Sequence, residues 1–125
     1  MRIKKSVVYA VIGIFFMFMA IPADSADFNF SGKWKQIENP DTFKTIKEVS
    51  NGTFEVIGYD NVANWKNHGI GFVTSKGYLI WSYVNDGDGD AGFGTLKPMK
   101  NNQFSQESYN TDGTKRSKVT YIRTR

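Results

Sequence analysis

Three aspartates alternate with glycines in the segment Asp86-Gly87-Asp88-Gly89-Asp90. Carboxylate oxygens at every second residue are hard ligands of the kind that Ca²⁺ prefers. The segment departs from the EF-hand pattern twice, because Ala91 stands where that loop needs glycine and Lys97 where it needs a bidentate glutamate. Aspartate and glycine also favour tight turns without any metal. Two interpretations remain, an acidic hairpin turn and a weak extracellular calcium site, and we expect the turn.

Residues for nucleophilic or acid–base catalysis are sparse. The chain has no cysteine and a single histidine, His68, which excludes thiol nucleophiles, disulfides, zinc–thiolate sites and multi-histidine metal centres. A lone histidine is able to act as a general base near pH 7, but no catalytic-triad spacing, nucleophile elbow or phosphate-binding loop accompanies it. We therefore expect His68 to be a surface or loop-packing residue, and we expect neither an enzyme nor a bound cofactor.

Aromatic side chains offer the other kind of chemistry, ligand binding. The chain has 10 Phe, 6 Tyr and 3 Trp, most of them after residue 25. Such rings either simply fill a small core or line a pocket for a small, largely apolar or aromatic ligand, with a few polar groups to orient it. For such a pocket we expect a lining of five rings and three polar side chains: Trp65, Phe72, Trp81, Tyr83, Phe93, Thr95, Gln106 and Ser108.

Short alternating runs separated by Asn, Asp and Gly predict the elements that would position these residues. The spacing indicates eight strands, over Phe30–Glu38, Phe43–Ser50, Thr53–Tyr59, Gly69–Thr74, Tyr78–Val84, Gly92–Lys97, Gln103–Tyr109 and Ser117–Thr124. Short turns, of which Asn51-Gly52 is the strongest signal, join most of them and make neighbours antiparallel. The segment Asp60–His68 reads as either a loop or a short helix. We expect an all-β, up-and-down meander closed into a small barrel, since closure removes both sheet edges.

Alternation assigns the strand faces. We expect Ile70 and Phe72 to point inward, together with Leu79, Trp81 and Tyr83 of the next strand. The other face of that strand is also apolar, which predicts either a covering element or a subunit contact through residues 78–84.

Five glycines recur on neighbouring predicted strands. Glycine weakens a strand by roughly 0.5–1 kcal/mol relative to alanine, so its recurrence indicates either coiling of the sheet or close approach of a backbone or ligand. We expect coiling to be the reason for Gly69, Gly71, Gly77, Gly92 and Gly94.

The N-terminus predicts export. Basic residues in Met1–Lys5 precede the apolar run Ser6–Ile21, and Pro22 and small residues follow. This is the layout of a secretory signal peptide, which we expect to span residues 1–25 with cleavage near 25/26, leaving one domain over 26–125. An uncleaved anchor is the alternative, although the run is shorter than the roughly 20 residues that span a bilayer. Either way, the domain is expected to be secreted or periplasmic, and free of the membrane after cleavage.

The charge balance argues against nucleic acid as a partner. The chain carries 16 basic and 12 acidic residues, a formal net charge of +4, which is too near balance for a dedicated phosphate-binding surface. Basic residues do gather at Lys115-Arg116-Ser117-Lys118, with Arg123 and Arg125 beyond. A solvated cluster is the expectation, and a patch for anionic glycans or lipid headgroups is the alternative.

The sequence Ser31-Gly32-Lys33-Trp34 on the first predicted strand, with Arg123 near the other end of the chain, resembles the calycin superfamily of lipocalins and avidin-like proteins. The resemblance implies a small barrel in which Trp34 closes one end and Arg123 packs over its indole, a sound pair for a guanidinium and an aromatic ring. No run matches the ligand-binding residues of avidins, so the resemblance identifies no ligand.

We therefore expect an exported barrel that binds a small molecule in its open end, since eight strands enclose a lumen that either is filled by side chains or holds one small ligand. The main alternative is an interaction module with a solid core, such as an inhibitor or a surface protein. An enzyme with a barrel pocket is a further alternative, which a carboxylate pair facing the lumen would favour.

Overall fold

The structure, a computed structural model, describes residues 28–124 of the 125-residue chain. The predicted signal peptide lies outside this range. Eight strands make up the fold: β2 (Gly32–Gln36), β3 (Thr42–Ser50), β4 (Thr53–Asp60), β5 (Trp65–Val73), β6 (Leu79–Asn85), β7 (Ala91–Met99), β8 (Gln103–Asn110) and β9 (Lys115–Arg123). Among the described residues, no helix is long and apolar enough to cross a membrane.

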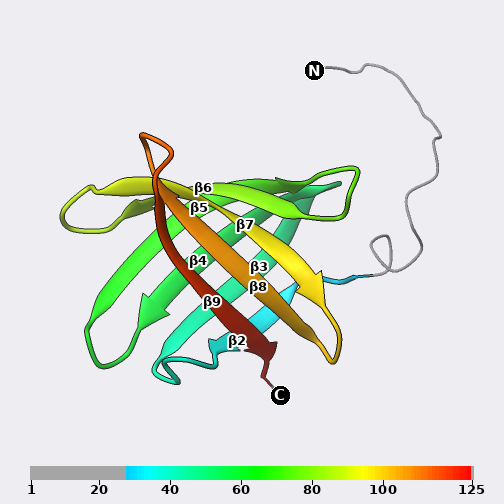
Figure 1. The fold of residues 1–125 in the computed structure, drawn as a ribbon, viewed down its shortest axis with the longest axis horizontal. Helices are drawn as coiled ribbons and strands as arrows, with labels where there is room; N and C mark the ends of the chain where they lie inside the picture. Colours follow the sequence, from blue (N-terminus) through cyan, green and yellow to red (C-terminus); the bar gives the residue numbers. More distant parts are fainter. Residues whose placement is uncertain (1–27, 125) are drawn as a thin grey trace.

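The strands form one closed barrel in chain order, and each pairs antiparallel with its neighbours (Figure 1). Pairing of β2 with β9, which places Trp34 opposite Arg123, completes the cylinder. The predicted fold class is confirmed. It follows from the sequence because short turns force antiparallel neighbours and closure leaves no strand edge unpaired.

The largest error in the predicted strands is the segment before Gly69. The structure has a four-residue turn over 61–64 there, and β5 already begins at Trp65. Asp60 holds this turn, because its Oδ1 accepts hydrogen bonds from the backbone N–H of Val62 (2.9 Å) and Ala63 (2.7 Å). Asn64 adopts a left-handed φ of 61°, which asparagine tolerates better than most residues. His68 consequently lies on a strand.

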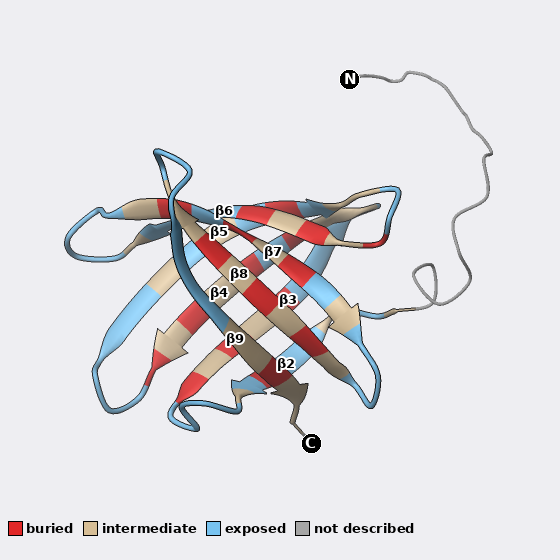
Figure 2. Cartoon of the chain, viewed as in Figure 1, coloured by how far each residue is buried: buried red, intermediate tan, exposed pale blue. Residues whose placement is uncertain are grey.

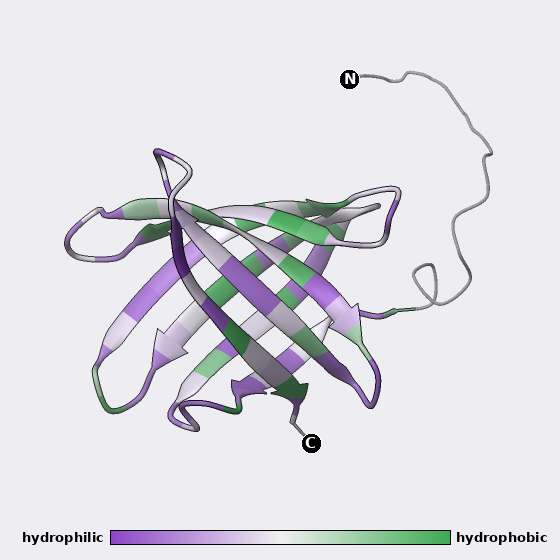
Figure 3. Cartoon of the chain, in the orientation of Figure 1, coloured by the Kyte–Doolittle hydropathy of each residue, from purple (hydrophilic) through white to green (hydrophobic). Residues whose placement is uncertain are grey.

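Burial alternates along the strands, so that one face packs inside the barrel and the other meets solvent (Figure 2). The core contains mostly large apolar side chains: Phe30, Trp34, Ile46, Phe54, Val56, Leu79, Trp81, Tyr83, Leu96, Phe104 and Tyr121. Figure 3 shows the same alternation as hydropathy along the strands.

The expected inward direction of Ile70 and Phe72 is wrong, because both lie on the outer face and are 54% and 56% exposed. The inner positions of β5 include Gly69 and Gly71. Across the register, Gly71 and Gly94 flank Trp81, while Gly69 and Gly92 flank Tyr83.

These glycines make room for the two rings and for the neighbouring backbone. A Cβ on Gly94 would lie 2.8 Å from Trp81 Nε1, and one on Gly92 would lie 2.5 Å from Tyr83 Oη. A Cβ on Gly69 would overlap the carbonyl oxygen of Ser82. Close approach of rings and backbone therefore explains these glycines, where coiling of the sheet was expected, and bulky inner side chains on β6 are matched by empty inner positions on both neighbours.

One end of the barrel is closed as the G-x-W pattern predicts. Trp34 is fully buried, its Nε1 donates to the carbonyl of Phe30 (2.9 Å), and the Arg123 guanidinium lies 4.2 Å from its ring centroid. Arg123 also donates to the backbone carbonyls of Ser31 and Asn29. Gly32 has a φ of 134°, and a Cβ there would lie 2.7 Å from Arg123 Nη1. The pattern needs glycine for its backbone and for the space that arginine occupies.

Candidate functional site: the open half of the lumen

A cavity of about 170 Å³ lies inside the barrel, toward the end opposite Trp34 and Arg123. Its walls are aromatic and polar and come from six of the eight strands: Gln36, Lys44, Trp65, Asn67, Trp81, Tyr83, Gln106, Ser108, Ser117, Val119 and Tyr121. An apolar cavity of about 150 Å³ holds one benzene molecule. The space therefore suits a compact molecule of up to roughly ten heavy atoms.

Lys44 is the most unusual residue of this cavity. It lies on β3 between Trp34 and Gly58 in the register, and its side chain is only 2% exposed. Its Nζ lies 4.2 Å from the ring centroid of Trp81 and 5.2 Å from that of Tyr121. Within residues 28–124, Lys44 forms no ion pair. Burial lowers the pKa of this lysine to about 7, while the two rings favour its charged form.

Two further residues that line this cavity carry a buried polar atom without a partner. Among the described residues, the Nε1 donor of Trp81 and the Oε1 acceptor of Gln106 are buried without a hydrogen bond. Buried polar groups are nearly always paired, with protein or with ordered water, since an unmade hydrogen bond costs about 1–3 kcal/mol. One unpaired donor, one unpaired acceptor and one ammonium without an ion pair thus belong to residues that line a single small space.

Asn67, Gly58 and Tyr121 determine the space and the polarity around Lys44. Asn67 Oδ1 accepts a hydrogen bond from the backbone N–H of Gly58 (3.1 Å). A Cβ on Gly58 would lie 2.6 Å from that oxygen and 3.5 Å from Lys44 Nζ. The absence of a side chain at position 58 therefore lets Asn67 and Lys44 share the interior. Burial also raises the pKa of Tyr121 to about 12, against the effect of the hydrogen bond from Gln36.

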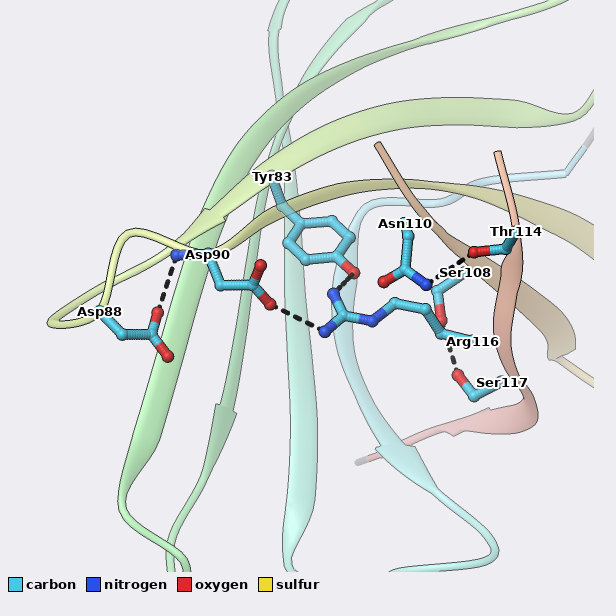
Figure 4. Close-up of polar contacts among 8 residues, drawn as sticks. All are labelled: Tyr83, Asp88, Asp90, Ser108, Asn110, Thr114, Arg116 and Ser117. Carbon is cyan, nitrogen blue, oxygen red and sulfur yellow. Dashed lines mark hydrogen bonds and ion pairs between the residues drawn. The ribbon is translucent and has the colours of Figure 1, made fainter. Parts of the chain in front are cut away.

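A polar network ties strands together at the rim of the open end (Figure 4). Arg116, at the start of β9, donates from Nη1 to the Tyr83 hydroxyl (3.1 Å) and from Nη2 to Asp90 (2.8 Å). The Oγ atoms of Ser108 and Ser117 form a hydrogen bond of 2.6 Å beside it. Arg116 thereby links β9 to β6 and to the residue before β7, which no backbone ladder does.

Five of the eight predicted lining residues meet at this cavity: Trp65, Trp81, Tyr83, Gln106 and Ser108. The other three lie elsewhere. Phe72 and Phe93 are on the outer face, 56% and 36% exposed. Thr95 lines an open hollow of about 460 Å³ on the outside of β7, β8 and β9, among Lys97, Glu107 and Lys118.

Lys44, Asn67 and Tyr121 also line the cavity and were not among the predicted lining residues. A signal for Lys44 exists, because Thr42, Lys44 and Ile46 alternate with Phe43 and Thr45, and Ile46 marks the buried face. Phe43 obscures that signal, because it is the largest apolar residue of the strand and its position is on the other face. Phe43 instead lies outside, where its ring stacks on Tyr59 with centroids 5.5 Å apart.

The acidic segment forms the β6–β7 turn, and its carboxylates have protein partners. Asp86 contacts His68 Nδ1 (2.8 Å), Asp88 accepts from the backbone N–H of Asp90 (2.8 Å), and Asp90 pairs with Arg116. No group of three or more potential metal ligands occurs in the part of the chain that the structure describes. His68 is exposed, and its ion-pair geometry with Asp86 joins the outer face of β5 to this turn.

The outer face of β5, β6 and β7 is apolar where most of the barrel exterior is polar. Ile70, Phe72, Val84 and Phe93 are all exposed. The register places Phe72 opposite Ile80, and it places Ser82 between Ile70 and Phe93. These residues form a continuous patch, which we call the β5–β7 face.

Comparison with known proteins gives no relative for this chain. No family model matches the sequence, and neither a curated protein nor a solved structure is similar to it at a significant level.

Proposed function

We propose that the protein binds one small molecule in the open half of its barrel. The observation that carries the proposal is a cavity lined by Lys44, which forms no ion pair, and by Trp81 and Gln106, whose Nε1 and Oε1 atoms make no hydrogen bond within the described chain. A lumen that served only as a core would be filled and saturated, because each unpaired buried polar group weakens the fold. The aromatic walls favour a flat ligand, and the polar atoms favour one with hydrogen-bonding groups.

We propose further that the protein is exported and calycin-like. Support comes from the N-terminal sequence, from the G-x-W pattern and from the closed end, where Trp34 and Arg123 pack as the resemblance implies. In that arrangement one end of the barrel is sealed and the other is open, and a ligand has a single way in.

Two-dimensional NMR of the ¹⁵N-labelled domain tests ligand binding. The indole N–H signals report on three separate places, since Trp34 lies in the closed end, Trp81 in the cavity and Trp65 at its wall. A panel of indole, phenol, benzamide, benzoate and glucose is added in turn. We expect at least one compound to shift the Trp81 signal and leave that of Trp34 unchanged. If none does so at millimolar concentration, the proposal fails.

A matched pair of variants sharpens this test. Ser108 points into the cavity, whereas Ser105 lies on the outer face of the same strand. Ser108→Leu fills the cavity and should abolish the shift, while Ser105→Leu should keep it. Native mass spectrometry of the protein purified from its own host identifies whatever is carried along.

The β5–β7 face supports a second candidate function, protein–protein interaction. This face groups four exposed apolar side chains, Ile70, Phe72, Val84 and Phe93, on neighbouring strands. Grouped apolar residues indicate an interaction surface, whereas single exposed ones do not. Self-association through residues 78–84 is its simplest form. Sedimentation of Phe72→Ser beside the original protein tests it: a dimer that the substitution dissociates supports the candidate, and a monomer at 100 μM or so in both cases contradicts it.

A further inference from the structure

We infer that the ligand of this cavity is a small organic anion, a compact carboxylate whose charged group pairs with the Lys44 ammonium. This inference rests on the proposed function and adds the chemical class of the ligand. It is carried by geometry: a fully buried lysine, between two rings, at the wall of a cavity, with no anionic partner among residues 28–124.

Lys44 lacks an anionic partner among the described residues. An ammonium removed from water needs an opposite charge or a full set of acceptors. The faces of Trp81 and Tyr121 supply part of this stabilisation, since aromatic rings attract cations. Asp60 is the nearest candidate carboxylate in the register, on the strand beside Lys44. It is already occupied by donors from Thr42, Asn39, Val62 and Ala63.

The unpartnered atoms of Trp81 and Gln106 indicate which other groups the ligand carries. A carboxylate supplies acceptors for both Lys44 and the unpartnered Trp81 Nε1. The unpartnered Gln106 Oε1 instead requires a donor. A carboxylate with a hydroxyl or N–H group elsewhere in the molecule therefore satisfies all three. The cavity of about 170 Å³ limits such a molecule to roughly the size of a hydroxybenzoate.

Charged side chains lie at the open end of the barrel, where a ligand would enter the cavity. Arg116 stands at the rim, and Lys115 and Lys118 lie on the same strand. Each lysine shares Glu107 as its partner, and Arg116 pairs with Asp90. The acidic turn over 86–90 lies at the same end of the barrel, so the preference for an anion comes from Lys44 inside the cavity and not from the charge of the rim.

The charge on Lys44 makes binding sensitive to pH. Its pKa is about 7 without ligand, and a carboxylate pairs only with the protonated form. The other ionisable groups that pack around this part of the lumen are Glu38, Asp60, Tyr83, Arg116 and Tyr121. Hydrogen bonds from Thr42 and Ala63 lower the pKa of Asp60, and burial raises that of Tyr121 to about 12. Lys44 therefore titrates between pH 6 and pH 8, and carboxylate affinity should fall about tenfold over that range.

Calorimetric titration with 4-hydroxybenzoate and its neutral amide, 4-hydroxybenzamide, at pH 6 and pH 8 tests the inference. We expect the carboxylate to bind more tightly than the amide at pH 6 and to lose about tenfold in affinity at pH 8, while the amide changes little. Lys44→Met should remove both the preference and its pH dependence. Lys47→Met, an exposed position of the same strand, should leave both intact.

The unmodified protein already decides the outcome, even if Lys44→Met does not fold. Equal affinity for carboxylate and amide, or a carboxylate affinity that does not depend on pH, overturns the anion inference but leaves ligand binding standing. Absence of binding by every compound of the NMR panel overturns both. A carboxylate that binds while the Trp81 signal stays fixed places the anion outside the cavity and also refutes the inference.

Discussion

The two halves of the barrel lumen are built in opposite ways. Around Trp34, aromatic rings pack closely: the Phe104 ring centroid lies 4.6 Å from that of Trp34, and Tyr121 stacks on Phe104 at 5.2 Å. The polar atoms there are paired, as Trp34 Nε1 and the Arg123 guanidinium show. Around Lys44, three residues that line one cavity carry an ammonium without an ion pair, an indole N–H without a hydrogen bond and an amide oxygen without a hydrogen bond in the described chain.

This difference is the basis of the function proposed for the open half. The closed half saturates its polar groups and excludes space, which is what a folding core requires. The open half retains space and unsatisfied groups, which weaken the fold and are characteristic of binding sites. The following predictions alter one half at a time.

Removal of the closed-end indole should have the largest effect. Trp34→Ala leaves a cavity under Arg123 and removes the ring on which the Arg123 guanidinium packs. We therefore expect a loss of about 3–5 kcal/mol in the free energy of unfolding. Urea denaturation measures it. Trp65→Ala, at the partly exposed wall of the open half, is the matched control and should cost under about 1 kcal/mol. Equal losses of unfolding free energy in the two variants would show that both halves of the barrel contribute equally to stability.

Removal of the buried charge should act in the opposite direction. In the native state the pKa of Lys44 falls from 10.5 to about 7. Between these values the unfolded chain binds more protons than the native one, so native stability rises with pH. The full shift corresponds to about 5 kcal/mol, and we expect less because the rings of Trp81 and Tyr121 stabilise the ammonium.

Lys44→Met should therefore stabilise the unliganded protein at pH 6 by about 1–4 kcal/mol, and the difference from the original protein should shrink by pH 10. Thermal unfolding across this range measures it, with Lys47→Met as the reference. A destabilised Lys44→Met at pH 6 would mean that the ammonium has a partner in solution.

Filling an inner glycine should have an intermediate effect. Gly94→Ala places a methyl group 2.8 Å from Trp81 Nε1, and the indole has to move within a crowded layer, so we expect a loss of about 1–3 kcal/mol. The displaced indole should also weaken any ligand that shifts the Trp81 signal. Urea denaturation and the NMR titration test the two parts, and an unchanged stability would show that this layer is loosely packed.

Cutting the rim network should have the smallest effect on stability. Arg116→Gln removes the ion pair with Asp90, which is half exposed, and such pairs contribute about 0–1 kcal/mol. We expect little change in stability but faster amide hydrogen exchange in the turn over 86–90, which Arg116 links to β9. Lys115→Gln is the control on the same strand, and identical exchange in both variants would contradict a linking role.

Much of the fold is determined by local sequence. The turn at Gly52, with its φ of 78°, and the consecutive left-handed residues Asn101 and Asn102 lie where the turn signals predict them. Alternation sets the strands between such turns, and the pairing of Trp34 with Arg123 follows from the resemblance. The start of β5 was not predicted although its signals are local: Asp60 accepts hydrogen bonds from the backbone N–H groups two and three residues further on, and Asn64 adopts a left-handed φ.

The site depends on tertiary structure more heavily. The sequence by itself determined that aromatic and polar residues line a closed barrel of eight strands, since period-two alternation and short antiparallel turns are local properties. It did not determine which face of β5 turns inward. Apolar Ile70 and Phe72 lie outside, because Trp81 and Tyr83 on the neighbouring strand occupy the space and only glycine fits opposite them. Only the closed barrel brings Lys44 to Trp81 and Gln106, because three strands that are distant in the chain meet there across the lumen.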